Sequence, residues 1–203
     1  MREIITTVYS YDELNEKAKE KARDWYREGA FDYGWWDCTF EDFVRICNIL
    51  GITVKGEGSK NLAVYFSGFY TQGSGASFAG SWEYQGNAVC QIREYAPTDT
   101  ELHEIAEALH KIAARYEQSE GYEDDYPISA NITQSGRYSH ELSMRCDSDS
   151  GELDEDLLEQ FRYLAQWLYS RLESEYEYLN SDEVVEESIR ANEYEFDENG
   201  GIA

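Results

Sequence analysis

The residues of this chain that could do chemistry are mostly carboxylates, and their spacing places them in pairs on helices. Side chains four residues apart share a helix face, about 5–6 Å from each other, and like charges at that spacing repel. A fixed array of carboxylates can imitate the dense phosphates of nucleic acid and occupy a basic groove. A solvated acidic surface is the alternative interpretation. The expected partner-binding carboxylates are those of Asp124, Asp125, Glu155, Glu159, Glu173, Glu177, Glu183, Glu186 and Glu187.

Other reactive groups show no pattern typical of catalysis or metal binding. His103 and His110 are seven residues apart, whereas a metal-binding helix pairs its histidines at four. A calcium loop that starts at Asp147 needs glycine at its sixth position and glutamate at its twelfth, but Glu152 and Leu158 stand there. No nucleophile motif occurs either. We therefore expect no catalytic residue, no metal and no cofactor; an enzyme of unfamiliar type would need a deep pocket with a histidine.

A glycine-rich aromatic segment, Tyr65–Gly80, allows two interpretations. Gly73 and Gly75 could form an anion-binding nest of backbone amides. The flanks resemble strands rather than a helix start, and a charge of −25 disfavours a phosphate ligand, so a tight hairpin or bulge is the better prediction. A second functional hypothesis is an antitoxin or adaptor module that binds protein through an aromatic patch. That patch would comprise Trp35, Trp36, Phe69 and Tyr70.

Hydrophobic periodicity predicts the elements that position these residues. Capping boxes at Ser10–Glu13 and Thr98–Glu101 are expected to start two helices. The predicted helices span about residues 11–29, 39–50, 102–116 and 153–179, with a short one capped by Ser181. The predicted strands are 3–9, 52–54, 62–69, 76–83, 88–93, 128–132, 138–146 and 193–197. The result is an α+β fold: an antiparallel sheet of about five to seven strands packed with about four or five helices.

Composition supports one compact domain over residues 1–203. Hydrophobic residues make up 41% and aromatic residues 15%, so the chain should fold despite 42 acidic against 17 basic residues. The charge is uneven, because residues 117–203 hold 24 acidic and five basic residues and form an acidic C-terminal pole. Such a charge disfavours direct binding of nucleic acid or of anionic membranes.

The expected location is the cytoplasm. The four cysteines contain no C-x-x-C pair, and an aromatic-rich core does not need disulfides. The N-terminal residues alternate like a strand instead of forming a signal peptide, and no stretch approaches the roughly 20 apolar residues of a membrane span.

Two motifs carry a resemblance. Residues 11–22 read YDELNEKAKEKA, and residues 66–78 read FSGFYTQGSGASF. With Trp35 and Trp36, these motifs resemble those of uncharacterised small acidic proteins of tailed phages and prophages, mainly over residues 5–85. The resemblance implies action inside a bacterial host cell. Together with the acidic pole, it leads us to expect a non-enzymatic inhibitor of the anti-CRISPR or anti-restriction type. Its partner would be a host protein with a basic, nucleic-acid-binding surface, and its oligomeric state stays open.

Overall fold

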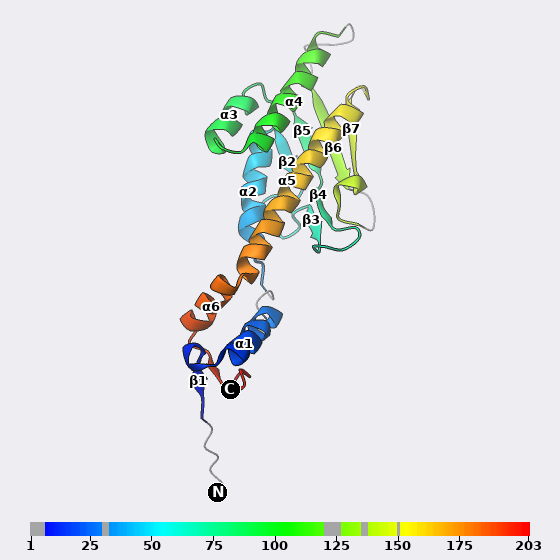
Figure 1. Ribbon diagram of the computed structural model, residues 1–203. Helices are drawn as coiled ribbons and strands as arrows, with labels where there is room; N and C mark the ends of the chain where they lie inside the picture. The colour runs from blue at the N-terminus through cyan, green and yellow to red at the C-terminus, as the bar shows by residue number, and fades with distance from the viewer. Residues whose placement is uncertain (1–6, 30–32, 120–126, 135–137, 150) are drawn as a thin grey trace. The chain divides into compact units, whose positions relative to one another are not determined.

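The computed structural model describes residues 7–29, 33–119, 127–134, 138–149 and 151–203, and within them it has six α-helices and eight strands (Figure 1). Contacts divide the chain into a central unit, residues 38–172, and a terminal unit, residues 1–37 and 173–203. The α+β class with antiparallel pairing is confirmed. A single domain over residues 1–203 stays a prediction.

The central unit is built on a four-stranded antiparallel sheet in the order β2-β5-β6-β7. Its strands are β2 (Ile52–Val54), β5 (Gly80–Glu83), β6 (Ser129–Gln134) and β7 (Met144–Ser148). Burial alternates along them, as expected for a sheet with one face against the core. In one row across the sheet, the buried Ile52, Trp82 and Ala130 pair with one another. The sheet is therefore smaller than the predicted one of about five to seven strands, because the remaining strands form separate pairs.

Strands β3 (Val64–Ser67) and β4 (Gly75–Phe78) form one such pair, a hairpin around the glycine-rich loop. The predicted hairpin is thus confirmed, but its loop, residues 68–74, is longer than a tight turn. Gly73 has a φ of 86°, a left-handed conformation that glycine adopts without steric cost. The strand predicted over residues 76–83 is in fact two strands, β4 and β5, which belong to different sheets.

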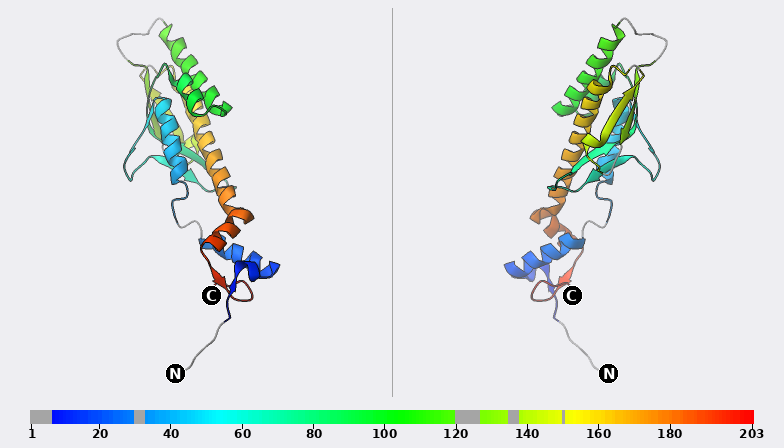
Figure 2. Two further views of the ribbon diagram at one scale, coloured as in Figure 1. Left: turned by 90° about the vertical axis from the view of Figure 1, so that its left-hand side faces the viewer. Right: turned by 90° about the vertical axis from the view of Figure 1, so that its right-hand side faces the viewer.

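The described residues of the central unit form four helices: α2 (Asp37–Ile49), α3 (Ala88–Tyr95), α4 (Thr100–Glu117) and the first part of α5 (Asp154–Asn180). Helices α2, α4 and α5 lie on one face of the sheet (Figure 2), and α3 packs on α4. Edge-to-face aromatic contacts join α2 and α5 to strand β4: the Phe78 ring centroid lies 5.3 Å from that of Phe43 and 6.4 Å from that of Phe161. Residues 88–93 are not a strand as predicted, because Ala88 and Ile92 bury one face of a helix that packs on α4.

The predicted strand 138–146 also differs from the structure. Its pairing with β6 is antiparallel as expected, but the strand begins at Met144. Before it, His140 caps a short 3-10 turn, Glu141–Ser143, and the Leu142 amide donates to His140 Nδ1 (3.2 Å). A local side-chain hydrogen bond thus competes successfully with the strand ladder.

The terminal unit joins the two ends of the chain. It contains the antiparallel pair β1 (Tyr9–Ser10) and β8 (Glu195–Phe196), the helices α1 (Glu16–Gly29) and α6 (Asp182–Ala191), and the last turns of α5. The core of this unit is formed by Tyr11, Leu14, Ala18, Ala22, Val185, Ile189 and Phe196. The Ser10 capping box encloses a 3-10 turn, Tyr11–Glu13, so α1 starts later than predicted. Of the strand predicted over residues 3–9, positions 3–6 lie outside the described residues.

Candidate functional site

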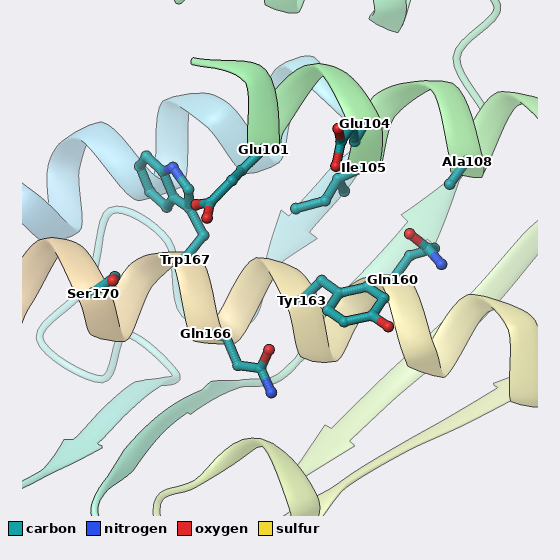
Figure 3. A pocket seen from close by; sticks show the side chains of 9 residues that line it. All are labelled: Glu101, Glu104, Ile105, Ala108, Gln160, Tyr163, Gln166, Trp167 and Ser170. Atoms are coloured by element: carbon teal, nitrogen blue, oxygen red, sulfur yellow. The ribbon is translucent and has the colours of Figure 1, made fainter.

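A groove of about 480 Å³ lies between helices α4 and α5 of the central unit (Figure 3). The amphipathic pattern of α4 explains its position: Leu102, Ile105 and Leu109 face the core, so the neighbouring face of the helix is left to line the groove. In Figure 3, Trp167 rises from α5 toward Glu101 of α4.

The α4 wall of the groove is acidic. Glu101 and Glu104 are exposed and three residues apart, so they share a face of the helix. Below them, Ile105 is 4% exposed and supplies an apolar floor, while the small side chain of Ala108 leaves room one turn further on. This wall combines a negative rim with an apolar base.

The α5 wall is aromatic and neutral. Tyr163 is 47% exposed, and its hydroxyl donates to Glu159 Oε1 (3.1 Å), which raises the pKa of the tyrosine. Gln160 and Gln166 add amide groups, which can donate and accept hydrogen bonds. Trp167 is 5% exposed and closes the floor from this side. The hydrogen bond from Tyr163 places one of the predicted carboxylates, Glu159, beside the groove.

Asp99 ties the two walls together. Its Oδ1 accepts from the Leu102 amide (3.2 Å) and so caps α4, whereas the sequence predicted a capping box starting at Thr98. Its Oδ2 accepts from the Trp167 indole N–H (2.9 Å) and from Arg171 (2.6 Å). Partial burial by itself would raise the pKa of Asp99, but the hydrogen bonds from Trp167, Leu102 and Arg171 together hold it below its ordinary value.

Nearby basic side chains are already paired with other carboxylates. These pairs are Arg93–Glu107, Lys111–Glu107, Arg115–Asp156 and Arg171–Asp99. Within the described part of the chain, no ion pair reaches the two groove glutamates, Glu101 and Glu104, or the predicted Glu155 and Glu159. Four carboxylates on α4 and α5 therefore keep a negative charge that no ion pair within the described residues offsets.

The predicted acidic residues are distributed over both units. Glu155 and Glu159 belong to the central unit, while Glu173, Glu177, Glu183, Glu186 and Glu187 belong to the terminal unit. The acidic pole defined by sequence, residues 117–203, is thus divided within α5. Asp124 and Asp125 lie outside the described residues.

Glu186 differs from the other predicted carboxylates because it is held inside the terminal unit. It pairs with Arg23 (3.0 Å) and with Arg190 (3.0 Å). Partial burial opposes its ionisation, but hydrogen bonds from Tyr11 and Arg190 and the charges of both arginines lower its pKa. Glu183 and Glu187 on the same helix are exposed, so α6 has a paired acidic face and an outward acidic face.

The alternative aromatic site falls into two clusters, one in each unit. In the terminal unit, Trp35 is only 9% exposed and its ring lies 5.6 Å from that of Trp36. In the central unit, Phe69 packs 5.4 Å from Tyr169. Of the four predicted aromatic residues, Tyr70 alone is largely exposed, at 71%, and its φ of 64° is unusual for a residue other than glycine.

A second hollow, of about 920 Å³, lies in the central unit along β2, β5 and β6. Hydroxyl and amide side chains such as Thr53, Ser81 and Asn131 line much of it. It has neither the charge excess nor the aromatic wall of the α4–α5 groove. The groove is therefore the better candidate site.

In the ranges that the structure describes, no group of three or more His, Cys, Asp or Glu side chains is arranged to hold a metal ion. Nor is any helix in those ranges both long and apolar enough to cross a membrane. All four cysteines, each in a described segment, are free of disulfides.

Sequence reasoning missed Asp99, Glu101 and Glu104. The spacing of the two glutamates on the outer face of a predicted helix was a usable signal. No local pattern, however, shows that α4 and α5 lie next to each other, since strands β6 and β7 and a 3-10 turn separate the two helices along the chain.

The structure thus defines an α+β protein with an acidic, aromatic groove between two helices. Residues 35–182, most of the chain, match the family model described as a domain of unknown function, DUF8835, and the chain belongs to that family. The match contains the whole central unit, including the groove, and leaves out α1 and nearly all of α6. Searches of curated proteins and of solved structures found no match.

Proposed function

We propose that this protein is a non-enzymatic inhibitor, of phage origin, that binds a host nucleic-acid-handling protein inside a bacterial cell. The observation that carries the proposal is the set of carboxylates on α4 and α5 without ion pairs among the described residues: Glu101, Glu104, Glu155 and Glu159. Anti-CRISPR or anti-restriction activity is the natural form, and no catalytic residue is assigned.

The physical basis is mimicry of phosphate charge. A surface that binds nucleic acid does so largely through Lys and Arg side chains that neutralise phosphates. Carboxylates held on two adjacent helices offer the same charge at fixed positions, and the net charge of −25 speeds encounter with a basic partner. Such binding weakens as salt screens the charges.

The test compares the wild type with a variant carrying E101K, E104K, E155K and E159K. Partners are captured from bacterial lysate at low and high salt, identified by mass spectrometry, and purified. We expect capture to fall at least tenfold in the variant and double-stranded DNA to compete with the wild type for the purified partner. Retained capture by the variant, or a partner that DNA does not displace, would contradict the proposal. A variant with E183K and E187K is the control for the exposed face of α6.

A second candidate function is an antitoxin or adaptor module that uses aromatic contacts. The exposed Tyr70, held at a positive φ on the hairpin loop, favours it because strained exposed residues cluster at binding sites. Under this alternative, capture survives high salt and is lost in Tyr70→Ala. Tyr65→Ala, which removes another exposed tyrosine of the same hairpin, is the matched control.

A further inference from the structure

We infer that the α4–α5 groove binds a basic amphipathic helix of the partner. This inference rests on the proposed function and deepens it, since it names the element of the partner that the acidic surface recognises. An amphipathic helix in a groove places apolar side chains at positions i, i+3, i+4 and i+7 into the floor. The apolar floor, the two walls and the preformed shape of the groove support this proposal.

The floor suits apolar side chains. Ile105 and Trp167 are 4% and 5% exposed, so they form its fixed base. Ala108 faces α5 across the groove in Figure 3, and its single methyl group helps leave the space of about 480 Å³. That volume suits a few side chains rather than a whole helix, so the backbone of the ligand helix would lie above the groove.

The walls set the chemistry of the ligand's two flanks. Glu101 and Glu104 rise about 4.5 Å relative to each other along α4, the same rise that separates residues i and i+3 of a helix lying alongside. Lys or Arg at that spacing can therefore face both carboxylates. Gln160 on the α5 wall is neutral, and its amide can both donate and accept hydrogen bonds. The ligand helix should consequently carry its basic residues on the flank next to α4.

Contacts within the protein hold the groove in a preformed shape. Asp99 joins the start of α4 to Trp167 of α5, and the Arg171 guanidinium lies 5.1 Å from the centre of the Trp167 ring. A preformed site loses less conformational entropy when the ligand arrives.

The negative charge of the groove disfavours nucleic acid, anionic lipid and a second copy of this chain as its ligand. The carboxylates of the α4 wall would repel nucleic acid and anionic lipid, and a second copy of this chain would bring a further charge of −25. A cationic helix is complementary to both the rim and the floor.

The test is a titration of the whole protein with a fluorescent peptide of about 18 residues, long enough for five helical turns. The peptide carries Leu at i, i+3, i+4 and i+7 with Lys between them, and the comparison peptide has the same composition in scrambled order. We expect the amphipathic peptide to bind at least tenfold more tightly than the scrambled one. Binding should fall at least tenfold in Ala108→Trp, which fills the groove, and several-fold in the E101Q/E104Q double variant.

The matched control is the double variant E183Q/E187Q, which removes the same charge from the terminal unit and should change affinity less than twofold. Equal affinity for the two peptides, or an equal loss in E183Q/E187Q and E101Q/E104Q, would overturn the groove assignment. Because Ala108→Trp could disturb folding, the isosteric Glu→Gln variants keep the test decisive.

The proposed function and the groove assignment can be refuted independently of each other. If the peptide ignores the groove while the four-lysine variant still loses its DNA-displaceable partner, mimicry stands and the groove assignment falls. If the peptide binds in the groove but DNA displaces no captured partner, the groove assignment stands and mimicry falls.

Discussion

Replacing Asp99 by alanine should destabilise the central unit more than any other single change at the groove, because one carboxylate makes three contacts. Loss of a helix N-cap costs about 0.5–2 kcal/mol. Loss of the hydrogen bond between Trp167 and the charged carboxylate costs about 1.5–3 kcal/mol. The Arg171 side chain is 51% exposed, so its ion pair adds at most about 1 kcal/mol. Since contributions that share a group do not add, we expect the free energy of unfolding to fall by about 2–4 kcal/mol.

Asp99→Asn separates the role of Asp99 as the cap of α4 from its role as a clamp, the contacts that join it to Trp167 and Arg171 of α5. The asparagine oxygen can still accept from the Leu102 amide, but its NH₂ group would face two donors, Trp167 and Arg171. We expect an intermediate loss, about 1–2 kcal/mol. Urea unfolding followed by far-UV circular dichroism measures both variants, and a double-mutant cycle with Trp167→Phe isolates the clamp.

The stabilisation from Asp99 should depend on pH in a defined direction. The folded protein holds the pKa of this carboxyl below its unfolded value of about 3.9. Its contribution is therefore fully present above about pH 4 and is lost as the pH falls through the lower folded pKa. The difference in stability between wild type and Asp99→Ala should narrow in acid. A loss below about 0.5 kcal/mol at neutral pH, within the range of ordinary surface substitutions, would refute the clamp.

Three further predictions follow from the packing. Gly80→Ala should lower the free energy of unfolding in urea by about 2 kcal/mol or more, because the added Cβ would collide with the Thr53 carbonyl oxygen. A neutral effect would contradict that close approach of the two strands. Glu186→Gln should lower the free energy of unfolding by about 1–3 kcal/mol in a thermal melt, because the ion pairs with Arg23 and Arg190 are lost. Glu187→Gln on the exposed face should change it by no more than about 0.5 kcal/mol. Burial raises the pKa of Cys47 well above its usual value, so at mildly alkaline pH an aromatic disulfide reagent should label Cys47 slowly and the exposed Cys38 and Cys90 quickly. Fast labelling of Cys47 in the folded protein would contradict its burial.

Local patterns predicted the long elements well. The apolar stripe of α5 and the Ser181 cap of α6 are repeated signals within one stretch of chain, and both helices are confirmed. The prediction failed at α3, where a short apolar segment suited either a strand or a helix and contact with α4 selected the helix. It failed again over residues 76–83, since an extended pattern does not show that neighbouring residues join different sheets.

Sequence by itself determined the α+β class, the amphipathic faces and the excess of carboxylates, because these depend on composition and on periodicity within single elements. Tertiary structure decided which carboxylates keep their charge available. Glu186 is paired with Arg23, 163 residues away, whereas Glu101 and Glu104 line a groove whose other wall is some sixty residues further along the chain. Coulomb attraction depends on the distance between charges in space and not along the chain, and burial depends on the surrounding elements. Only the folded chain brings those groups together.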